Sequence, residues 1–287
     1  MSRMDRYRFA GGTAVLTGAA SGIGEQLAHG LARRGSHLVL LDRDAERLDR
    51  VRAAIAQENS GITVSTVVVD LADRDATVAA AETILREHER ITLLVNNAGA
   101  ALGGRFDQVT LDEFEWLMDV NFRAPVVLTH TLLPTLTAAP GRHVVNVSSL
   151  FGLIAPAGQS AYCASKFALR GLSQVLWAEL AESGTGVTTV HPGGIRTRVA
   201  DSARIGSGVP TELVDGQKKA FDKLLTYPPE KAAEQILDGV ERRRARVLIA
   251  ASAKIPDVLA RLLPVIHQRL LALATGSGRP RSKATVR

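Results

Sequence analysis

A tyrosine and a lysine lie four residues apart in the segment Tyr162-Cys163-Ala164-Ser165-Lys166. Apolar residues recur every three or four positions over residues 161–182, which predicts a helix. Positions i and i+4 share one face of a helix, so the lysine ammonium can lie near the tyrosine hydroxyl. A free tyrosine has a pKa of about 10, and a nearby cation favours its phenolate. We therefore interpret Tyr162 and Lys166 as a pair that exchanges a proton as general acid or base.

Two polar residues upstream could assist this pair. Ser149 stands thirteen residues before Tyr162, just after the apolar run 143–147, and its hydroxyl could donate to a carbonyl oxygen. Ser148 is an equally small neighbour, and either serine could instead cap a turn. Asn121 falls in a helical pattern although asparagine is a poor helix former, so it could bridge backbone groups or hold a water beside the lysine. The candidate catalytic residues are Asn121, Ser149, Tyr162 and Lys166.

A glycine-rich turn, TGAASGIG, follows the first apolar run at residues 17–24. Between a strand and a helix, such a turn lets the backbone approach a pyrophosphate, whose charge is met by the amides that begin the helix. Asp42, twenty-four residues after Gly18, could accept hydrogen bonds from the ribose hydroxyls of an adenosine and repel a 2′-phosphate. A helix-capping or surface aspartate is the alternative, and Arg43 softens the repulsion. The sequence thus favours NAD(H) over NADP(H).

The elements that must position these groups alternate along the chain. Short, nearly continuous apolar runs are separated by segments with helical periodicity, which is typical of a parallel sheet covered on both faces. We therefore predict one α/β domain over residues 1–274, a doubly wound Rossmann fold with a seven-stranded parallel sheet, in which the candidate groups follow the carboxyl ends of strands. The expected strands cover residues 13–17, 37–41, 63–69, 91–95, 143–147, 187–190 and 246–250.

Three segments depart from this alternation. Residues 198–228 are polar and glycine-bearing, and we expect a flexible insertion that overhangs the carboxyl edge of the sheet and meets substrate. Residues 255–274 predict one amphipathic helix, which could be a lid, a peripheral membrane contact or a packing element; we favour packing or a lid. Residues 275–287 are basic without any acid, and we expect them to be disordered.

Composition narrows the class of protein. The chain has 287 residues, is 46% hydrophobic and carries a net charge of +6, of which the last thirteen residues supply four charges. The nearly neutral body argues against a nucleic-acid partner. A single cysteine, Cys163, and an N-terminus without the apolar stretch of a secretory signal are consistent with a cytoplasmic protein. No transmembrane segment and no metal site is predicted.

Taken together, these motifs resemble those of the classical short-chain dehydrogenase/reductase family over roughly residues 8–200. TGxxxGIG is Thr17–Gly24, NNAG is residues 96–99, YxxxK is Tyr162–Lys166, and a PG motif is Pro192-Gly193 with Thr197 after it. The resemblance implies a tetrad in which Tyr162 exchanges a proton with the substrate, Ser149 orients the substrate oxygen, Lys166 lowers the tyrosine pKa and binds the nicotinamide ribose, and Asn121 holds a water. The residues expected to bind the cofactor are Gly18, Ser21, Gly22, Ile23, Gly24, Asp42, Asp70, Leu71, Asn97, Ala98, Gly99, Tyr162, Lys166, Pro192, Gly193, Ile195 and Thr197.

The expected reaction is hydride transfer between NAD(H) and a secondary alcohol or ketone. The apolar segment 150–158 and the lack of a well-placed cation favour a lipid-like or steroid-like substrate, with Arg196 and Arg198 as possible exceptions. An NADP(H)-preferring carbonyl reductase and a non-enzymatic dinucleotide-binding sensor or scaffold are the alternatives. We interpret His191 as a hydrogen-bonded strand-end residue, Cys163 as unreactive, and Met118 and Trp116 as packing residues. We expect a homodimer or homotetramer, the dimer through the helical segments 110–136 and 161–182.

Overall fold

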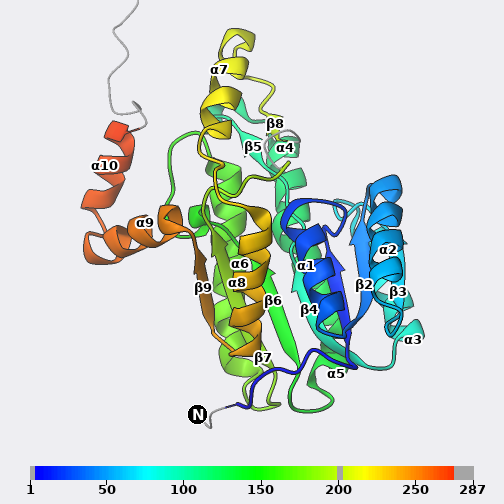
Figure 1. Cartoon of the computed structure of the whole chain (residues 1–287). Helices are drawn as coiled ribbons and strands as arrows, with labels where there is room; N and C mark the ends of the chain where they lie inside the picture. The colour runs from blue at the N-terminus through cyan, green and yellow to red at the C-terminus, as the bar shows by residue number, and fades with distance from the viewer. Residues whose placement is uncertain (1–3, 199–202, 275–287) are drawn as a thin grey trace, which may run out of the picture.

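A seven-stranded, wholly parallel sheet forms the centre of the computed structural model, which describes residues 4–198 and 203–274 (Figure 1). The strand order is β3-β2-β1-β4-β6-β7-β9, so the chain winds outward from β1 and then returns to start again at β4. The predicted seven strands and the doubly wound topology are confirmed. The strands are β1 (Thr13–Thr17), β2 (His37–Asp42), β3 (Val64–Val68), β4 (Ile91–Asn96), β6 (His143–Val147), β7 (Gly186–Pro192) and β9 (Arg246–Ile249).

Helices cover both faces of this sheet (Figure 1). The residues between α4 and α5 continue the helical path as a π-helical turn, η2, so the predicted segment 110–136 is helical but not one regular helix. The helices that cover the sheet or join it are α1 (Gly22–Arg33), α2 (Ala45–Glu58), α3 (Arg74–Glu87), α4 (Leu111–Met118), η2 (Asp119–Arg123), α5 (Ala124–Thr137), α6 (Ser160–Glu179) and α8 (Pro229–Glu241), with short 3₁₀ turns η1 (Phe106–Gln108) and η3 (Leu150–Gly152).

Two apolar cores lie on opposite faces of the sheet. Side chains alternate along each strand, so in β1 Leu16 packs with α1, α2 and α8, whereas Val15 packs with α3 and α5. Both faces of the central strands are therefore apolar, which explains why their sequences are nearly continuous hydrophobic runs. The sheet is rigid for this reason, and it can hold the loops at its carboxyl ends in fixed positions.

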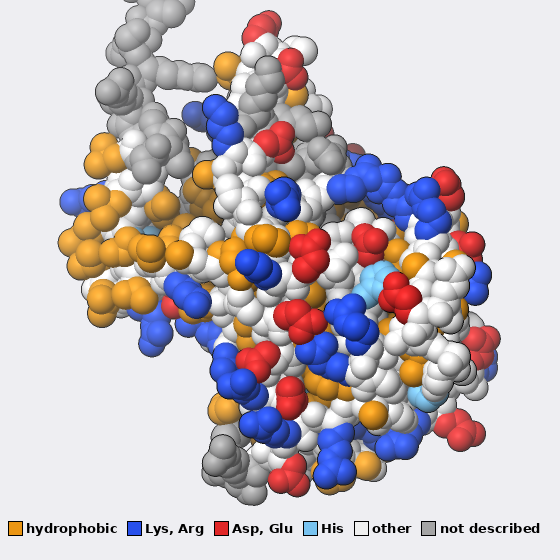
Figure 2. All heavy atoms as spheres, in the orientation of Figure 1, with side chains coloured by type: hydrophobic (Ala, Val, Ile, Leu, Met, Phe, Trp, Pro, Cys, Tyr) orange, Lys and Arg blue, Asp and Glu red, His pale blue; other side chains and the backbone are white. Residues whose placement is uncertain are grey.

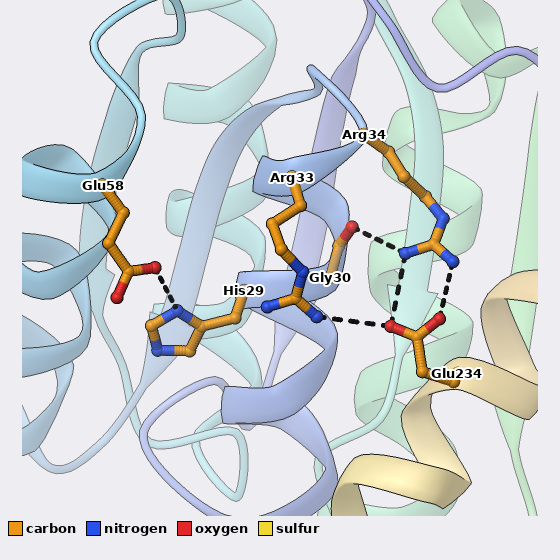
Figure 3. A network of polar contacts seen from close by, with 6 residues as sticks. All are labelled: His29, Gly30, Arg33, Arg34, Glu58 and Glu234. Atoms are coloured by element: carbon orange, nitrogen blue, oxygen red, sulfur yellow. Dashed lines mark hydrogen bonds and ion pairs between the residues drawn. The ribbon is translucent and has the colours of Figure 1, made fainter.

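Helix α1 is also joined to its neighbours by polar contacts (Figure 3). Arg34 and Arg33 donate to the Glu234 carboxylate of α8, at 2.7 and 3.3 Å, and His29 lies 3.5 Å from Glu58 of α2. The Glu234 and Glu58 carboxylates are 50% and 58% exposed, so these pairs orient α1 more than they stabilise it. The approach of α1 to α8 depends on Gly30, where a Cβ would lie 2.5 Å from the Leu237 side chain.

The end of the chain differs from the predicted single helix over residues 255–274. Two helices are present, α9 (Ala251–Leu262) and α10 (Ile266–Ala274), and the first begins four residues earlier than expected. The break follows from Pro264, which has no amide hydrogen and disfavours helical backbone at Leu263, where φ is −128° and ψ is 64°. Among the described residues, no helix combines the length and the apolarity needed to cross a bilayer. The basic tail 275–287 lies outside the described residues.

The segment 198–228 holds regular structure in the part that the structure describes. Strand β8 (Arg204–Ile205) pairs in parallel with β5 (Leu102–Gly103), and α7 (Thr211–Asp222) follows. The backbone amide of Gly206 extends this pairing by donating to Gly103 at 2.8 Å. The expected flexible insertion is therefore tied to the loop after β4, although residues 199–202 lie outside the described part of the chain.

A buried histidine at the start of β6 gives the fold a predictable pH dependence. His143 lies 2.8 Å through Nε2 from the Thr188 hydroxyl, and its Nδ1 lies 3.2 Å from the Arg243 guanidinium. Burial lowers the pKa of His143 to about 3, and the charge of Arg243 adds to this effect. An unfolded histidine has a pKa of about 6.5, so below that pH the unfolded chain binds a proton that the folded chain does not. The contribution of neutral His143 to the free energy of unfolding is complete above pH 6.5, and it falls as the pH drops toward 3.

We expect His143→Gln to flatten the dependence of stability on pH. Between pH 7 and pH 5 the wild-type protein should lose about 2 kcal/mol through this single group, and the variant should not. Urea unfolding at a series of pH values measures this loss. The exposed His130, replaced by Gln, serves as the control and should leave the slope as in wild type. Equal slopes for His143→Gln and wild type would contradict the assignment.

Candidate active site

A cavity of about 890 Å³ opens at the carboxyl ends of the strands, beside the point where the strand order reverses between β1 and β4. Open α/β sheets bind ligands at such a point. Every residue that the sequence suggested for cofactor binding lines this cavity, and so do Ser149, Tyr162 and Lys166. Asn121 is the exception, because it is fully buried behind the wall.

The glycine-rich turn between β1 and α1 depends on close backbone approach. Gly18 and Gly22 have φ of +67° and +58°, a region that disfavours other residues. A Cβ at Gly18 would lie 2.8 Å from the Ala98 Cα atom, and one at Gly24 would overlap the Gly18 carbonyl oxygen. Ser21 begins α1 without capping it through its own side chain, so the first-turn amides of α1 face the cavity without that acceptor. The turn can therefore receive an anion such as a pyrophosphate.

Asn97 holds this turn against the end of β4. Its Nδ2 donates to the carbonyl oxygens of Thr17 and Gly18, at 3.0 and 3.2 Å. The Thr17 hydroxyl in turn accepts from the amides of Asn97 and Ala98, each at 3.0 Å. The preceding residue, Asn96, donates to Asn146 of β6 at 2.8 Å and so ties two strands together. Of the two asparagines in the NNAG motif, Asn96 thus joins the strands and Asn97 lines the cavity.

Asp42 ends β2 at the far side of the turn. Its Oδ2 accepts from the Ala20 amide at 3.0 Å, and its Oδ1 accepts from the Asp44 amide at 3.1 Å. A carboxylate has about four acceptor positions, so these two bonds leave room for hydroxyl donors. Arg43 and Arg47 also line this end of the cavity, and Arg47 lies 3.2 Å from the Asp44 carboxylate. This end of the cavity therefore combines acidic and basic side chains.

Tyr162 and Ser149 meet at the opposite end of the cavity. Burial raises the pKa of the Tyr162 hydroxyl above its ordinary value, and a side-chain hydrogen bond with Ser149 opposes this rise. Ser149 begins η3 and accepts from the Phe151 amide at 3.1 Å, which fixes its side chain. The hydroxyl groups of Ser149 and Tyr162 therefore lie together at this end of the cavity.

Lys166 lies one helical turn beyond Tyr162, as the sequence predicted. Its Nζ lies 5.8 Å from the centroid of the tyrosine ring and donates to the Val147 carbonyl oxygen at 3.1 Å. Burial lowers the pKa of Lys166 to about 8. The expected lowering of the tyrosine pKa by the ammonium is not seen, because burial dominates the tyrosine and the ammonium bonds to a carbonyl rather than to the phenol oxygen.

Asn121 sits in the π-helical turn η2, a feature that often marks functional sites. Its Oδ1 accepts from the Ala100 amide at 2.8 Å, while its Nδ2 donates to the Ala100 carbonyl at 3.1 Å and to the Ser165 hydroxyl at 3.1 Å. The side chain thereby bridges the loop after β4 to α6. Gly99 lets it come close, since a Cβ there would lie 3.1 Å from Lys166 Nζ and 3.2 Å from Asn121 Oδ1.

Three neighbouring polar residues play supporting parts. Ser148 donates to the Lys166 carbonyl at 2.9 Å, so of the two adjacent serines it is the one that holds α6. His191 lies 3.0 Å through Nδ1 from the Ser149 carbonyl oxygen, and burial lowers its pKa to about 4. It is a strand-end residue that is neutral at physiological pH, as predicted. Burial raises the pKa of Cys163 to about 12, which leaves it a thiol that reacts poorly, in agreement with the sequence interpretation.

The cavity continues into an apolar region beyond Tyr162. Only Leu150 and Phe151 of the apolar segment 150–158 line it, since Leu153 and Ile154 are buried in the interior. Sequence reasoning missed most of this region, because its members come from distant elements that only the fold brings together. The further lining residues include Trp116, Val120, Leu224, Leu225, Ile255 and Pro256.

Trp116 and Arg204 form a stacked pair in this wall. The guanidinium carbon of Arg204 lies 3.6 Å from the centroid of the Trp116 ring, and both residues line the cavity. Arg198 lines it as well, whereas Arg196 does not. The expected lack of a well-placed cation is therefore wrong. Trp116 packs against the buried cluster of Leu102, Leu117 and Ala161, as predicted, and it also lines the cavity. No sequence motif indicates the contact between Trp116 and Arg204, because Arg204 belongs to a two-residue strand that pairs only in the folded chain.

Comparison with known proteins assigns this arrangement. The family model for short chain dehydrogenases matches residues 12–207. The oxidoreductase SadH of Mycobacterium tuberculosis is 40% identical over 279 residues, which cover 96% of this chain and 99% of SadH. The chain belongs to the short-chain dehydrogenase family.

Solved structures agree with this membership. A short-chain dehydrogenase from Sphingobium yanoikuyae in complex with NADPH is 32% identical, with a TM-score of 0.73 over 95% of this chain and 98% of that one. A short-chain dehydrogenase/reductase from Burkholderia phymatum in complex with NAD is 25% identical, with a TM-score of 0.78 over 96% and 99%. The protein is thus an NAD(P)-dependent oxidoreductase that acts on alcohol or ketone groups of small molecules.

Proposed function

We propose that this short-chain dehydrogenase transfers a hydride between NAD(H) and a secondary alcohol or ketone with an apolar body, using Asn121, Ser149, Tyr162 and Lys166. The observation that carries the proposal is the convergence of Ser149, Tyr162 and Lys166 on one end of a cavity whose other end is the glycine-rich turn. A nicotinamide dinucleotide, when bound, supplies the hydride acceptor or donor. The protein must then orient the substrate and manage one proton.

Tyr162 manages that proton in the proposed mechanism. Because burial raises its pKa, the phenol is protonated near neutral pH and can donate to a carbonyl oxygen during ketone reduction. Ser149 donates a second hydrogen bond to the same oxygen and so fixes its position. Alcohol oxidation requires the reverse transfer to a phenolate, and it is therefore favoured as the pH rises.

Lys166 and Asn121 assist the proton exchange at Tyr162 in the proposed mechanism. The Lys166 ammonium is held by the Val147 carbonyl and lies beside Gly99, where it can meet the hydroxyls of a ribose. Its lowered pKa, about 8, makes proton release near neutral pH easier than for an exposed lysine. Asn121 fixes the loop that carries Gly99 through both bonds to Ala100. The water expected at Asn121 remains part of the proposal.

The residues at the other end fit a dinucleotide. The turn at Gly18–Gly24 and the start of α1 would hold the pyrophosphate, and Asp42 would accept the ribose hydroxyls. Asp70 and Leu71 stand where an adenine would lie, and Ile195 and Thr197 would contact the carboxamide end. Asp42 supports NAD(H), because a 2′-phosphate would meet its negative charge, whereas Arg43 and Arg47 reduce this discrimination. An NADP(H)-preferring carbonyl reductase is therefore the second candidate.

Tyr162→Phe tests the proposed function directly. We expect the turnover number to fall by at least about a thousandfold, because Tyr162 is the group proposed to exchange the proton with the substrate oxygen, while NAD binding changes little. Steady-state kinetics with a secondary alcohol and NAD titration by fluorescence measure the two effects. Tyr227→Phe, outside the cavity lining, is the matched control and should keep its activity. A sensor or scaffold would show no turnover in any form and would bind NAD equally with either residue.

Asp42→Ala tests the cofactor preference. Removal of the carboxylate should raise the ratio of kcat/KM for NADP to that for NAD by about tenfold or more, since the repulsion of a 2′-phosphate is lost. Paired kinetics with both cofactors give this ratio. Asp49→Ala is the control, because that carboxylate lies on α2 outside the cavity lining and pairs with Arg52. A wild-type enzyme that already prefers NADP would overturn the NAD assignment.

A substrate panel tests the apolar body and the cation in its wall. Long-chain and polycyclic secondary alcohols should be better substrates than small hydrophilic ones. Arg204→Leu should raise KM about tenfold for an alcohol that ends in a carboxylate, and little for its methyl ester, because the stacked guanidinium pairs with an anion. Arg244→Leu, just before the amino end of β9 and outside the cavity lining, is the control. Better turnover of small hydrophilic alcohols would contradict the proposed substrate class.

A further inference from the structure

The two C-terminal helices present an exposed apolar surface on the outside of the molecule (Figure 2). We define the C-terminal face as the large apolar side chains of α9, α10 and the break between them. Their exposed fractions lie between 36% and 73%. They are Ile255, Val258, Leu259, Leu262, Leu263, Val265, Ile266, Leu270 and Leu273. A contiguous surface of this kind is uncommon on a soluble monomer and marks an interaction site.

The C-terminal face is fixed to the body by its opposite side. Ala253 and Asp257, one turn apart on α9, are buried, and the Asp257 carboxylate is hydrogen-bonded to Arg246 of β9. This ion pair holds α9 at the edge of the sheet. The large apolar side chains of the C-terminal face are exposed, so they stabilise the monomer little.

The exposed charges on the two C-terminal helices have one sign. Asp257 is the only acid in residues 251–287, and it is buried in its ion pair. Lys254, Arg261 and Arg269 are exposed on the two helices, and the sequence then adds Arg279, Arg281, Lys283 and Arg287. An apolar face bordered by cations matches the acyl and headgroup layers of an anionic membrane surface, where apolar burial and basic charge act together.

We propose that the C-terminal face docks the enzyme on the surface of a bilayer that contains anionic lipid. A second copy of this chain is a poorer occupant, because a two-fold contact would bring Lys254, Arg261 and Arg269 of both copies together without exposed acids on these helices to balance them. The lipid headgroups supply the missing negative charge. The helices lie on the membrane rather than across it, in keeping with their lengths of 12 and 9 residues.

Docking in this way connects the membrane to the substrate cavity. Ile255 belongs both to the C-terminal face and to the cavity lining, and Ser252 and Pro256 of the same helix line the cavity too. The mouth beside α9 would then open at the lipid surface, where an apolar alcohol or ketone concentrates. This second step rests on the proposed function, whereas the docking itself does not.

Vesicle flotation of the full-length protein tests the docking. Wild type should bind phosphatidylcholine–phosphatidylglycerol vesicles more tightly than pure phosphatidylcholine vesicles, and added salt should weaken the binding. Leu262→Ser with Leu273→Ser, at positions 72% and 73% exposed, should weaken it by about tenfold or more. Thermal unfolding should show that this variant remains folded.

The matched control places the same change on another exposed site. Phe106→Ser with Leu111→Ser, at positions 76% and 73% exposed on η1 and α4, should bind vesicles as wild type does. The docking is overturned if wild type fails to float with the mixed vesicles or if both double variants bind alike. It is also overturned if sedimentation shows that Leu262 and Leu273 instead hold two copies together and that vesicles do not compete.

Kinetics separate the docking from the proposed function. If the mouth opens at the lipid, Leu262→Ser with Leu273→Ser should keep wild-type turnover of a short, water-soluble secondary alcohol. It should lose about tenfold in kcat/KM for a long-chain alcohol presented in mixed vesicles. Equal loss on both substrates would contradict delivery from the membrane, whereas absence of turnover in wild type would contradict the proposed function and leave the flotation result standing.

Discussion

The buried ammonium of Lys166 is the constraint on which the rest of the site depends. A cation held away from water is costly unless polar groups surround it, and in the described chain no carboxylate forms an ion pair with this one. The Val147 carbonyl accepts from it, at a point where β6 ends and backbone oxygens become available. Burial pushes the lysine pKa down to about 8, so the group is poised between two charge states. The surrounding structure must therefore be rigid enough to keep it in place.

Several contacts provide this rigidity from different parts of the chain. Ser148 holds the backbone of Lys166 itself, and Asn121 reaches the next residue back, Ser165, through the π-helical turn. Gly99 leaves the space that the ammonium and Asn121 both approach. The loop that carries Gly99 is continuous with Asn97, which closes the glycine-rich turn. The proton-exchanging end and the anion-binding end are thus joined through one loop after β4, and neither end can move far without the other.

Local sequence patterns predicted the parts of the molecule that depend on short-range physics. The seven strands could be predicted because both faces of the sheet are apolar, which makes each strand a nearly continuous hydrophobic run. Because the strands are parallel, the residues that follow their carboxyl ends lie at one edge of the sheet. The spacing of Tyr162 and Lys166 placed both on one helical face. Their electrostatics could not be read in the same way, because the tyrosine pKa depends on burial more than on the neighbouring charge. Pro264 disfavours a continuous helix, but the strong apolar periodicity on both sides of it led to the prediction of a single helix.

Contacts between distant segments set the limit of sequence reasoning at the substrate end. Arg204 reaches Trp116 only because β8 pairs with β5, and neither two-residue strand has a recognisable pattern. The stacked pair gives the apolar wall one charged edge, so the cavity can distinguish substrates by their far end as well as by their bulk. Helix α9 adds a second long-range contact, since the Arg246–Asp257 pair sets which of its faces meets the cavity and which meets solvent. In the proposed function, substrate selection therefore depends on elements outside the shared family motifs, whereas the chemistry depends on residues within them.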